Sequence, residues 1–127
     1  MYYAAGEIKY AEPDPSKMCG DGRIEKLDRA PDPPNLRAEH IRFVEGAHTK
    51  WHYHTGEQLL MPTVGTGFVE FKGLPVLEIR SGDRVFIPAG VWHRHGARQG
   101  QTMTHIAVTT GETVWPKSDD CVHEISS

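Results

Sequence analysis

The sequence lacks several features that would assign a protein to a class at first sight. It has 127 residues, with 14 Lys and Arg against 17 Asp and Glu, for a net charge of −3. No basic surface is therefore expected that could hold nucleic acid or anionic lipid. No segment approaches the roughly 20 apolar residues of a membrane span, and we do not expect the opening MYYAAGEIKY to act as a secretory signal. We expect a cytoplasmic protein with no nucleic-acid or membrane partner.

Cysteine is also scarce. Cys19 and Cys121 are the only two, and they stand near opposite ends of the chain. They could pair, but isolated cysteines in a cytoplasmic protein favour reduced thiols over a structural disulfide. We therefore predict that the two thiols are free.

Helical periodicity is absent, because no window of ten or more residues carries a convincing apolar stripe. Instead, 13 glycines and nine prolines separate short runs rich in Val, Ile, Phe, Tyr and Thr. Strands are expected at residues 23–27, 36–44, 48–54, 58–64, 67–71, 76–79, 84–88, 92–96 and 102–109. Short strands at this spacing predict an all-β sandwich or closed barrel. We expect a single domain over 1–127, with a barrel core at about 23–110, an N-terminal arm at 1–22 and a C-terminal tail at 111–127.

The sequence does contain histidines at an unusual spacing. His52 and His54 stand in WHYH, and His93 and His95 stand in WHRH. Alternate residues of a strand point to the same side, so each pair presents two imidazoles to one face. Two such imidazoles can bind one metal ion. Either pair taken alone could also be an exposed pair on a strand.

Glycines and a proline frame both pairs. The two patterns are Gly46-x5-His52-x-His54-x3-Gln58-x6-Gly65 and Gly82-x5-Pro88-x-Gly90-x2-His93. They resemble the two motifs of the cupin superfamily, small β-barrels that hold a metal between strands. The resemblance implies a small single-domain cupin jelly-roll β-barrel. The metal ligands that it implies are His52, His54, Gln58 and His93.

Gln58 departs from the family pattern, which usually has Glu there, as Ala97 departs from the usual Asn. The neighbouring Glu57 would need a spacer that the motif does not allow. Three imidazoles and an amide are neutral, so a bound divalent ion would keep its full charge, which favours anionic ligands and Lewis-acid chemistry. The cofactor we expect is Mn(II), with Fe(II), Zn(II) and Ni(II) as alternatives.

Three longer segments carry a closer resemblance. KWHYHTGEQLLMPTVGTGFVE, GDRVFIPAGVWHRHGA and TMTHIAV look like parts of short bacterial cupins related to manganese-dependent hydroxynitrile lyases. The resemblance implies a lyase that cleaves or forms a C–C bond next to a metal-bound oxygen of a small-molecule substrate. Two alternatives stay open. One is a metal-dependent dioxygenase or isomerase of a small carbonyl, enol or sugar-like compound, and the other is a non-catalytic cupin that binds a metal or small ligand.

The remaining candidates follow from strand parity and from the resemblance. His105 is the candidate general base, with a hydrogen-bonded core histidine as the alternative. Glu39 would be costly inside a barrel unless paired, so either it has a role or the parity of its strand changes. Further pocket candidates are His95, Glu39, Ile41, Phe43 and Met103.

Apolar residues open the chain, namely Tyr2, Tyr3, Ile8 and Tyr10. A closed homo-oligomer would cover them, as small cupins commonly pair through sheet edges. We therefore expect a homodimer or homotetramer.

Overall fold

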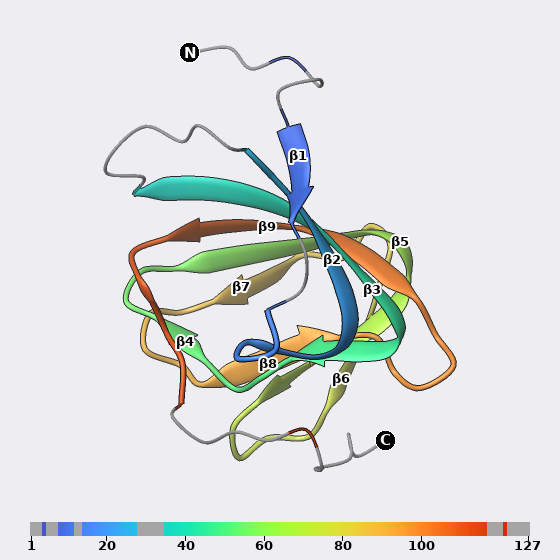
Figure 1. Cartoon of the computed structure of the whole chain (residues 1–127). Coiled ribbons are helices and arrows are strands. Elements are labelled where there is room, and N and C mark those ends of the chain that lie inside the picture. Colours follow the sequence, from blue (N-terminus) through green and yellow to red (C-terminus); the bar gives the residue numbers. More distant parts are fainter. Residues whose placement is uncertain (1–3, 5–7, 12–13, 28–34, 117–120, 122–127) are drawn as a thin grey trace.

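A computed structural model describes residues 4, 8–11, 14–27, 35–116 and 121 (Figure 1). All regular structure in these residues is strand, and none of them forms a helix that could cross a membrane. The strands are β1 (Ile8–Ala11), β2 (Met18–Leu27), β3 (Leu36–Thr49), β4 (Tyr53–His54), β5 (Gln58–Phe71), β6 (Leu77–Arg80), β7 (Val85–Ile87), β8 (His93–Gly96), β9 (Met103–Thr110) and β10 (Thr113–Val114). The prediction of an all-β fold is confirmed.

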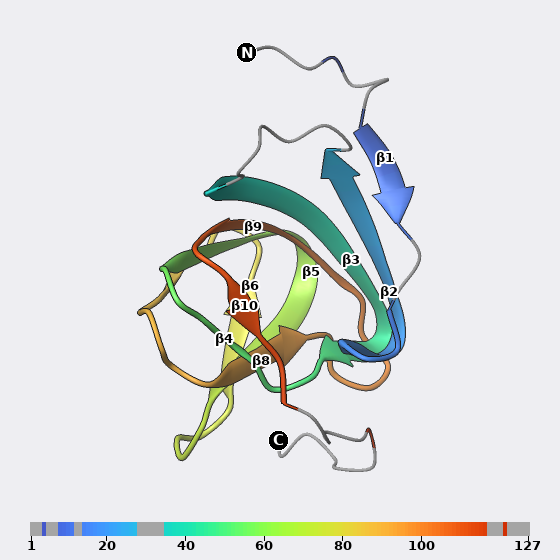
Figure 2. The same ribbon diagram turned by 60° about the vertical axis from the view of Figure 1, so that its left-hand side comes forward.

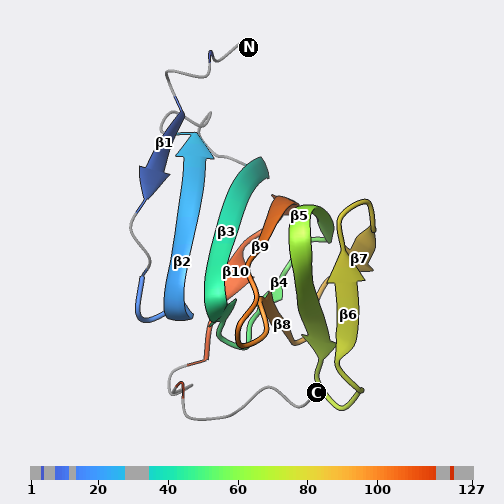
Figure 3. The same cartoon turned by 90° about the vertical axis from the view of Figure 1, so that its right-hand side faces the viewer.

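Two long strands close the sheet into a barrel. β3 and β5 have 14 residues each. β9 pairs with the first half of both strands, and β8 pairs with the second half of both. The ring β3–β9–β5–β8 therefore has no free edge between its members. β1 and β2 extend it on one side and β6 on the other (Figure 3). The structure thus decides between the two predicted architectures, in favour of the closed jelly-roll barrel.

Bends, not breaks, divide the long strands. Residues 58–64 and 67–71 were expected as two strands, but β5 runs through both. Gly65 lies at the bend with a φ of 78°, and a Cβ atom there would collide with the carbonyl oxygen of Thr102. Glycine is the residue that tolerates this conformation and this close approach. The bend lets β5 leave β9 and pair with β8, which closes the barrel.

The alternation predicted for the inward face is confirmed in β9, where every second side chain is buried, beginning with Met103. Ile41, Phe43 and Met103 are all buried in the core. Glu39 is half-buried on the same face of β3 as Ile41 and Phe43. The parity of this strand therefore does not change at Glu39.

β10 lies within the segment assigned to the C-terminal tail. It pairs antiparallel with β4, with Thr113 opposite His54 and Val114 opposite Tyr53 (Figure 2). The two short strands form a separate sheet at one end of the barrel. This part of the tail is thus a structural component of the barrel end.

The prediction of two free thiols is wrong. Cys19 and Cys121 form a disulfide with their Cα atoms 5.5 Å apart, across 102 residues of sequence. Cys19 lies on β2 opposite His48 of β3, and the disulfide places Cys121 beside it. Separation along the chain does not predict separation in space once a barrel has closed, which is why the sequence argument failed.

The homo-oligomer stays a prediction. Tyr2 and Tyr3 lie outside the described residues, whereas Ile8 and Tyr10 belong to β1, which pairs with β2 at the end of the sheet. The large apolar side chains exposed among the described residues are Leu36, Val64, Leu74, Leu77 and Phe86.

Candidate metal centre

His52 and His93 meet through a two-residue backbone bridge inside the barrel. The amide of each donates to the carbonyl oxygen of the other, at 2.9 and 2.8 Å. Both side chains are buried, and their ring centroids lie 4.3 Å apart. The two sequence motifs are therefore joined directly by backbone hydrogen bonds.

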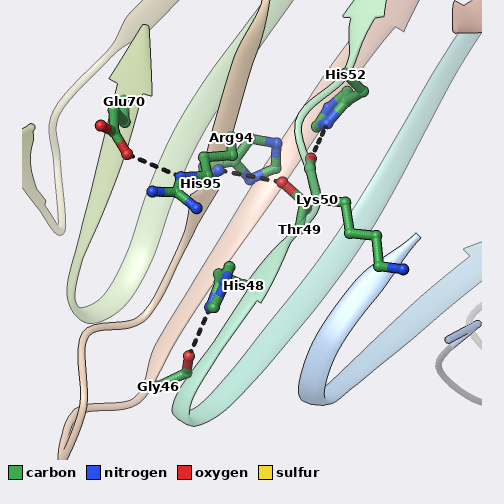
Figure 4. Close-up of polar contacts among 8 residues, drawn as sticks. All are labelled: Gly46, His48, Thr49, Lys50, His52, Glu70, Arg94 and His95. Atoms are coloured by element: carbon green, nitrogen blue, oxygen red, sulfur yellow. Dashed lines mark hydrogen bonds and ion pairs between the residues drawn. The ribbon is translucent and has the colours of Figure 1, made fainter. Parts of the chain in front are cut away.

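Backbone carbonyls hold both rings by the same atom. Nδ1 of His52 donates to the carbonyl oxygen of Lys50 at 2.7 Å (Figure 4), and Nδ1 of His93 donates to that of Val91 at 2.8 Å. A carbonyl oxygen can only accept, so Nδ1 carries the proton in each neutral ring. Nε2 of both histidines is left with a lone pair, which is the form that binds a metal.

His54 lies beside these two rings, with centroid distances of 5.0 Å to His52 and 5.2 Å to His93. Its Nδ1 is 2.9 Å from the hydroxyl of Thr113, and its buried Nε2 has no hydrogen-bond partner among the described residues. Sequence reasoning missed Thr113, because nothing in the tail indicated that it would return to β4.

Gln58 is oriented by the hydroxyl of Thr109. Its Nε2 donates to Thr109 Oγ1 at 2.9 Å, which leaves Oε1 at 3.1 Å from Nε2 of His93. With the proton of His93 on Nδ1, two lone-pair atoms face each other at that distance. A shared cation would remove their repulsion, so this part of the donor set fits a metal ion.

His95 joins the group more closely than expected. The candidate ligand nitrogens of His52, His93 and His95 all lie within 4.8 Å of one another, a spacing that one ion could span. The sequence predicts His95 as a pocket residue and not as a ligand. Its amide donates to Thr49 Oγ1 at 3.1 Å (Figure 4), and its Nε2 has no partner among the described residues. All four predicted ligands lie near this group, and the choice among the five donors remains a prediction.

His105 stands behind His95. Nε2 of His105 lies 3.0 Å from Nδ1 of His95, and Phe43 packs edge-on against both rings. His105 is completely buried. Its contact with the group formed by His52, His93 and His95 is therefore made through His95. Strand parity alone did not predict this contact.

Burial sets the protonation state of these rings. It lowers the pKa of His93, and it lowers the pKa of His52 and His95 well below the usual value. It also lowers the pKa of His54 and His105 to about 4. The imidazoles are thus neutral near pH 7, as metal binding and proton acceptance both require.

Arg94 and Trp115 make contacts around the histidines of the candidate metal centre. Arg94, between His93 and His95, pairs with Glu70 through Nε at 2.8 Å (Figure 4). Its Cζ atom also lies over the Trp51 ring, 4.6 Å from the ring centroid. The buried pair of Arg94 and Glu70 lies in the β5–β8 register that turns His93 and His95 inward. Trp115, just after β10, packs against His52 with ring centroids 4.4 Å apart.

Comparisons with known proteins agree with this geometry. The family described as the cupin domain matches residues 39–113. The (R)-mandelonitrile lyase of Granulicella tundricola is 40% identical over 91 residues, which cover 72% of this chain and 70% of that enzyme. A cupin-like protein from Thermotoga maritima is 31% identical, with a TM-score of 0.78 over 85% of each chain. A polyketide cyclase from Streptomyces resistomycificus shares the fold, at 18% identity and a TM-score of 0.71 over 98% of this chain and 88% of the cyclase.

Proposed function

The chain belongs to the cupin family, and from this premise we propose that it is a metal-dependent lyase of the hydroxynitrile lyase type. The observation that carries the proposal is a proton-accepting pair, His95 and His105, placed directly beside a neutral donor set. The 40% identity to a mandelonitrile lyase supports the substrate class. The substrate would be a small 2-hydroxynitrile, or an aldehyde and cyanide in the reverse direction.

The ion would be held by His52, His54, Gln58 and His93, which leaves Nε2 of His95 beside them as a proton acceptor. When bound, a divalent ion polarises a substrate oxygen and lowers the pKa of a substrate hydroxyl. We propose Mn(II), because the amide oxygen of Gln58 suits this ion, whereas imidazoles alone would favour Fe, Ni or Zn. No carboxylate belongs to the proposed donor set, so the set itself adds no negative charge that would repel cyanide.

The chain contributes a route for the proton. The hydroxyl proton passes to Nε2 of His95, while the Nδ1 proton of His95 passes to Nε2 of His105 across 3.0 Å. The C–C bond then breaks, its electron pair leaves with cyanide, and a carbonyl group remains on the substrate. The same pair returns a proton to cyanide, so that hydrogen cyanide and aldehyde are the products. Phe43, packed against both rings, keeps water away from this relay.

The test is turnover of mandelonitrile by the full chain. Chelator-treated protein is assayed before and after addition of Mn(II), with benzaldehyde and cyanide measured separately. We expect equal release of both products, dependent on the metal. Tight metal binding without product release would reject the lyase and favour a non-catalytic metal-binding cupin.

A further inference from the structure

Arg37 connects the barrel wall to β10. It lies on the inward-facing side of β3, opposite Thr109 in the register with β9. Its Nη1 donates to the carbonyl oxygen of Gly111, and its Nη2 donates to Thr113 Oγ1 at 3.0 Å. The planar guanidinium thus spans both ends of the turn into β10, a geometry that a single ammonium group cannot reproduce.

β10 needs this support. Its ladder with β4 has only two residue pairs, Thr113 with His54 and Val114 with Tyr53. A ladder of that length is marginal when isolated in water. The two donors of Arg37 therefore hold the Thr113 hydroxyl in position against the ring of His54.

The hydroxyl of Thr113 is a different kind of partner from the carbonyls that hold His52 and His93. A carbonyl oxygen only accepts, whereas a hydroxyl both donates and accepts. If Thr113 donated to Nδ1 of His54, the proton of the neutral ring would sit on Nε2, and that nitrogen could not bind a metal. Local geometry alone thus leaves the tautomer of His54 undetermined.

We propose that Arg37 and Thr113 are positioning residues that keep the proton of His54 on Nδ1 and its Nε2 available to the metal centre. In this arrangement Arg37 donates to one lone pair of Thr113 Oγ1 and Nδ1–H of His54 donates to the other, with the hydroxyl proton of Thr113 directed away from the ring. The buried, unpartnered Nε2 of His54 then faces the site as a ligand. The proposal rests on the metal centre of the proposed function but not on its lyase chemistry.

The first experiment measures metal affinity. Thr113→Val removes the hydroxyl and keeps the branched shape, Thr113→Ser keeps the hydroxyl, and Thr110→Val is the matched control. The Thr110 hydroxyl contacts the backbone of Glu57 at the same end of the barrel but does not touch His54. Mn(II) binding to chelator-treated full chain is followed by calorimetry. We expect Thr113→Val to lose about 10- to 100-fold in affinity, as is usual when a partner behind a ligand is removed, with Thr113→Ser and Thr110→Val near wild type.

The second experiment reads the tautomer without metal. Long-range ¹⁵N–¹H spectra of the metal-free chain distinguish a protonated Nδ1 from a protonated Nε2. We expect Nδ1–H for His54 in wild type and in Thr113→Ser, and a mixture or Nε2–H in Thr113→Val. Arg37→Lys, which keeps the charge but not the paired donors, should shift the tautomer and the affinity in the same direction.

Equal affinity and an equal tautomer in Thr113→Val and wild type would overturn the proposal, as would an equal loss in Thr110→Val. If Thr113→Val does not fold, Arg37→Lys decides, because wild-type affinity and tautomer in that variant contradict the assigned role. Neither readout uses mandelonitrile. A failure of the lyase assay therefore does not contradict the role proposed for Arg37 and Thr113. If the wild-type chain binds no metal, both that role and the proposed lyase function are wrong.

Discussion

The two halves of the metal centre are built in different ways. His52 and His93 are held by carbonyls two residues earlier in the chain. His54 and Gln58 are held by threonine hydroxyls 59 and 51 residues away. The first half is formed by local backbone geometry and one bridge, whereas the second depends on closure of the barrel and on β10. We conclude that changes far from the motifs can tune the second half and leave the first intact.

The largest effect on activity is expected from a change at His105, which belongs to neither half of the metal centre. His105→Ala should lower the rate of mandelonitrile cleavage by roughly 10²–10⁴, the usual contribution of general acid–base catalysis. Metal content should stay at the wild-type level, because His105 contacts His95 and none of the four predicted ligands. Parallel rate and metal measurements check this. An unchanged rate would mean that the proton is not passed to His105, with His95 acting alone or Glu39 as the next candidates.

Acid should act on both halves and on His105 behind them, since burial lowers the pKa of His52 and His93 in the first half, of His54 in the second, and of His105. The pKa of His54 and of His105 falls from 6.5 to about 4 on folding. Above pH 6.5 both imidazoles are neutral in the folded and in the unfolded chain, so they do not lower the free energy of unfolding. Between pH 6.5 and 4 the unfolded chain takes up protons first, so each ring costs up to about 3 kcal/mol of stability. Urea unfolding of metal-free protein across this range should show the loss, with a smaller loss in His105→Asn.

Removing a ligand from each half sharpens the comparison. His93→Ala should weaken Mn(II) binding by about 100-fold or more, above the range typical of changes behind a ligand. His54→Ala should cost less, because His93 also faces Oε1 of Gln58 and bridges to His52. Calorimetry of both variants gives the order. Full metal retention in His93→Ala would reject the metal centre as assigned.

The smallest expected effect concerns Gln58. Thr109→Val removes the hydroxyl that accepts from its amide, and we expect a loss of about 10-fold in Mn(II) affinity, the low end for such partners. Thr109→Ser should restore binding. The control is the double variant Gln58→Ala with Thr109→Val. If Thr109 acts only through Gln58, the Thr109→Val change should cause no further loss of Mn(II) affinity in the Gln58→Ala background. An additive loss in the double variant would show that Thr109 acts through another residue.

Strand alternation and motif spacing were better guides to the structure than the positions of the glycines. Strand alternation correctly predicted the buried face of β9, and motif spacing indicated that His52, His54, Gln58 and His93 are neighbours, whose role as metal ligands stays a prediction. Both depend on covalent geometry or on regular spacing along the chain. The bend at Gly65 and the positive-φ residues Glu45 and Gly46 inside β3 look like breaks in the sequence, because glycine signals a special conformation without saying whether pairing continues.

What the sequence by itself determined is therefore the all-β class, the inward and outward faces, and the neutral histidine-rich character of the site. Only the tertiary structure decided that the barrel closes through β8 and β9, that Cys19 meets Cys121, and that His95 lies among the histidines while His105 stands behind it. Only the tertiary structure, too, placed Thr109 and Thr113 behind Gln58 and His54. The physical reason is that side-chain direction is a property of a few neighbouring residues. The partner of a buried polar atom is instead selected by ring closure among strands that are distant in sequence.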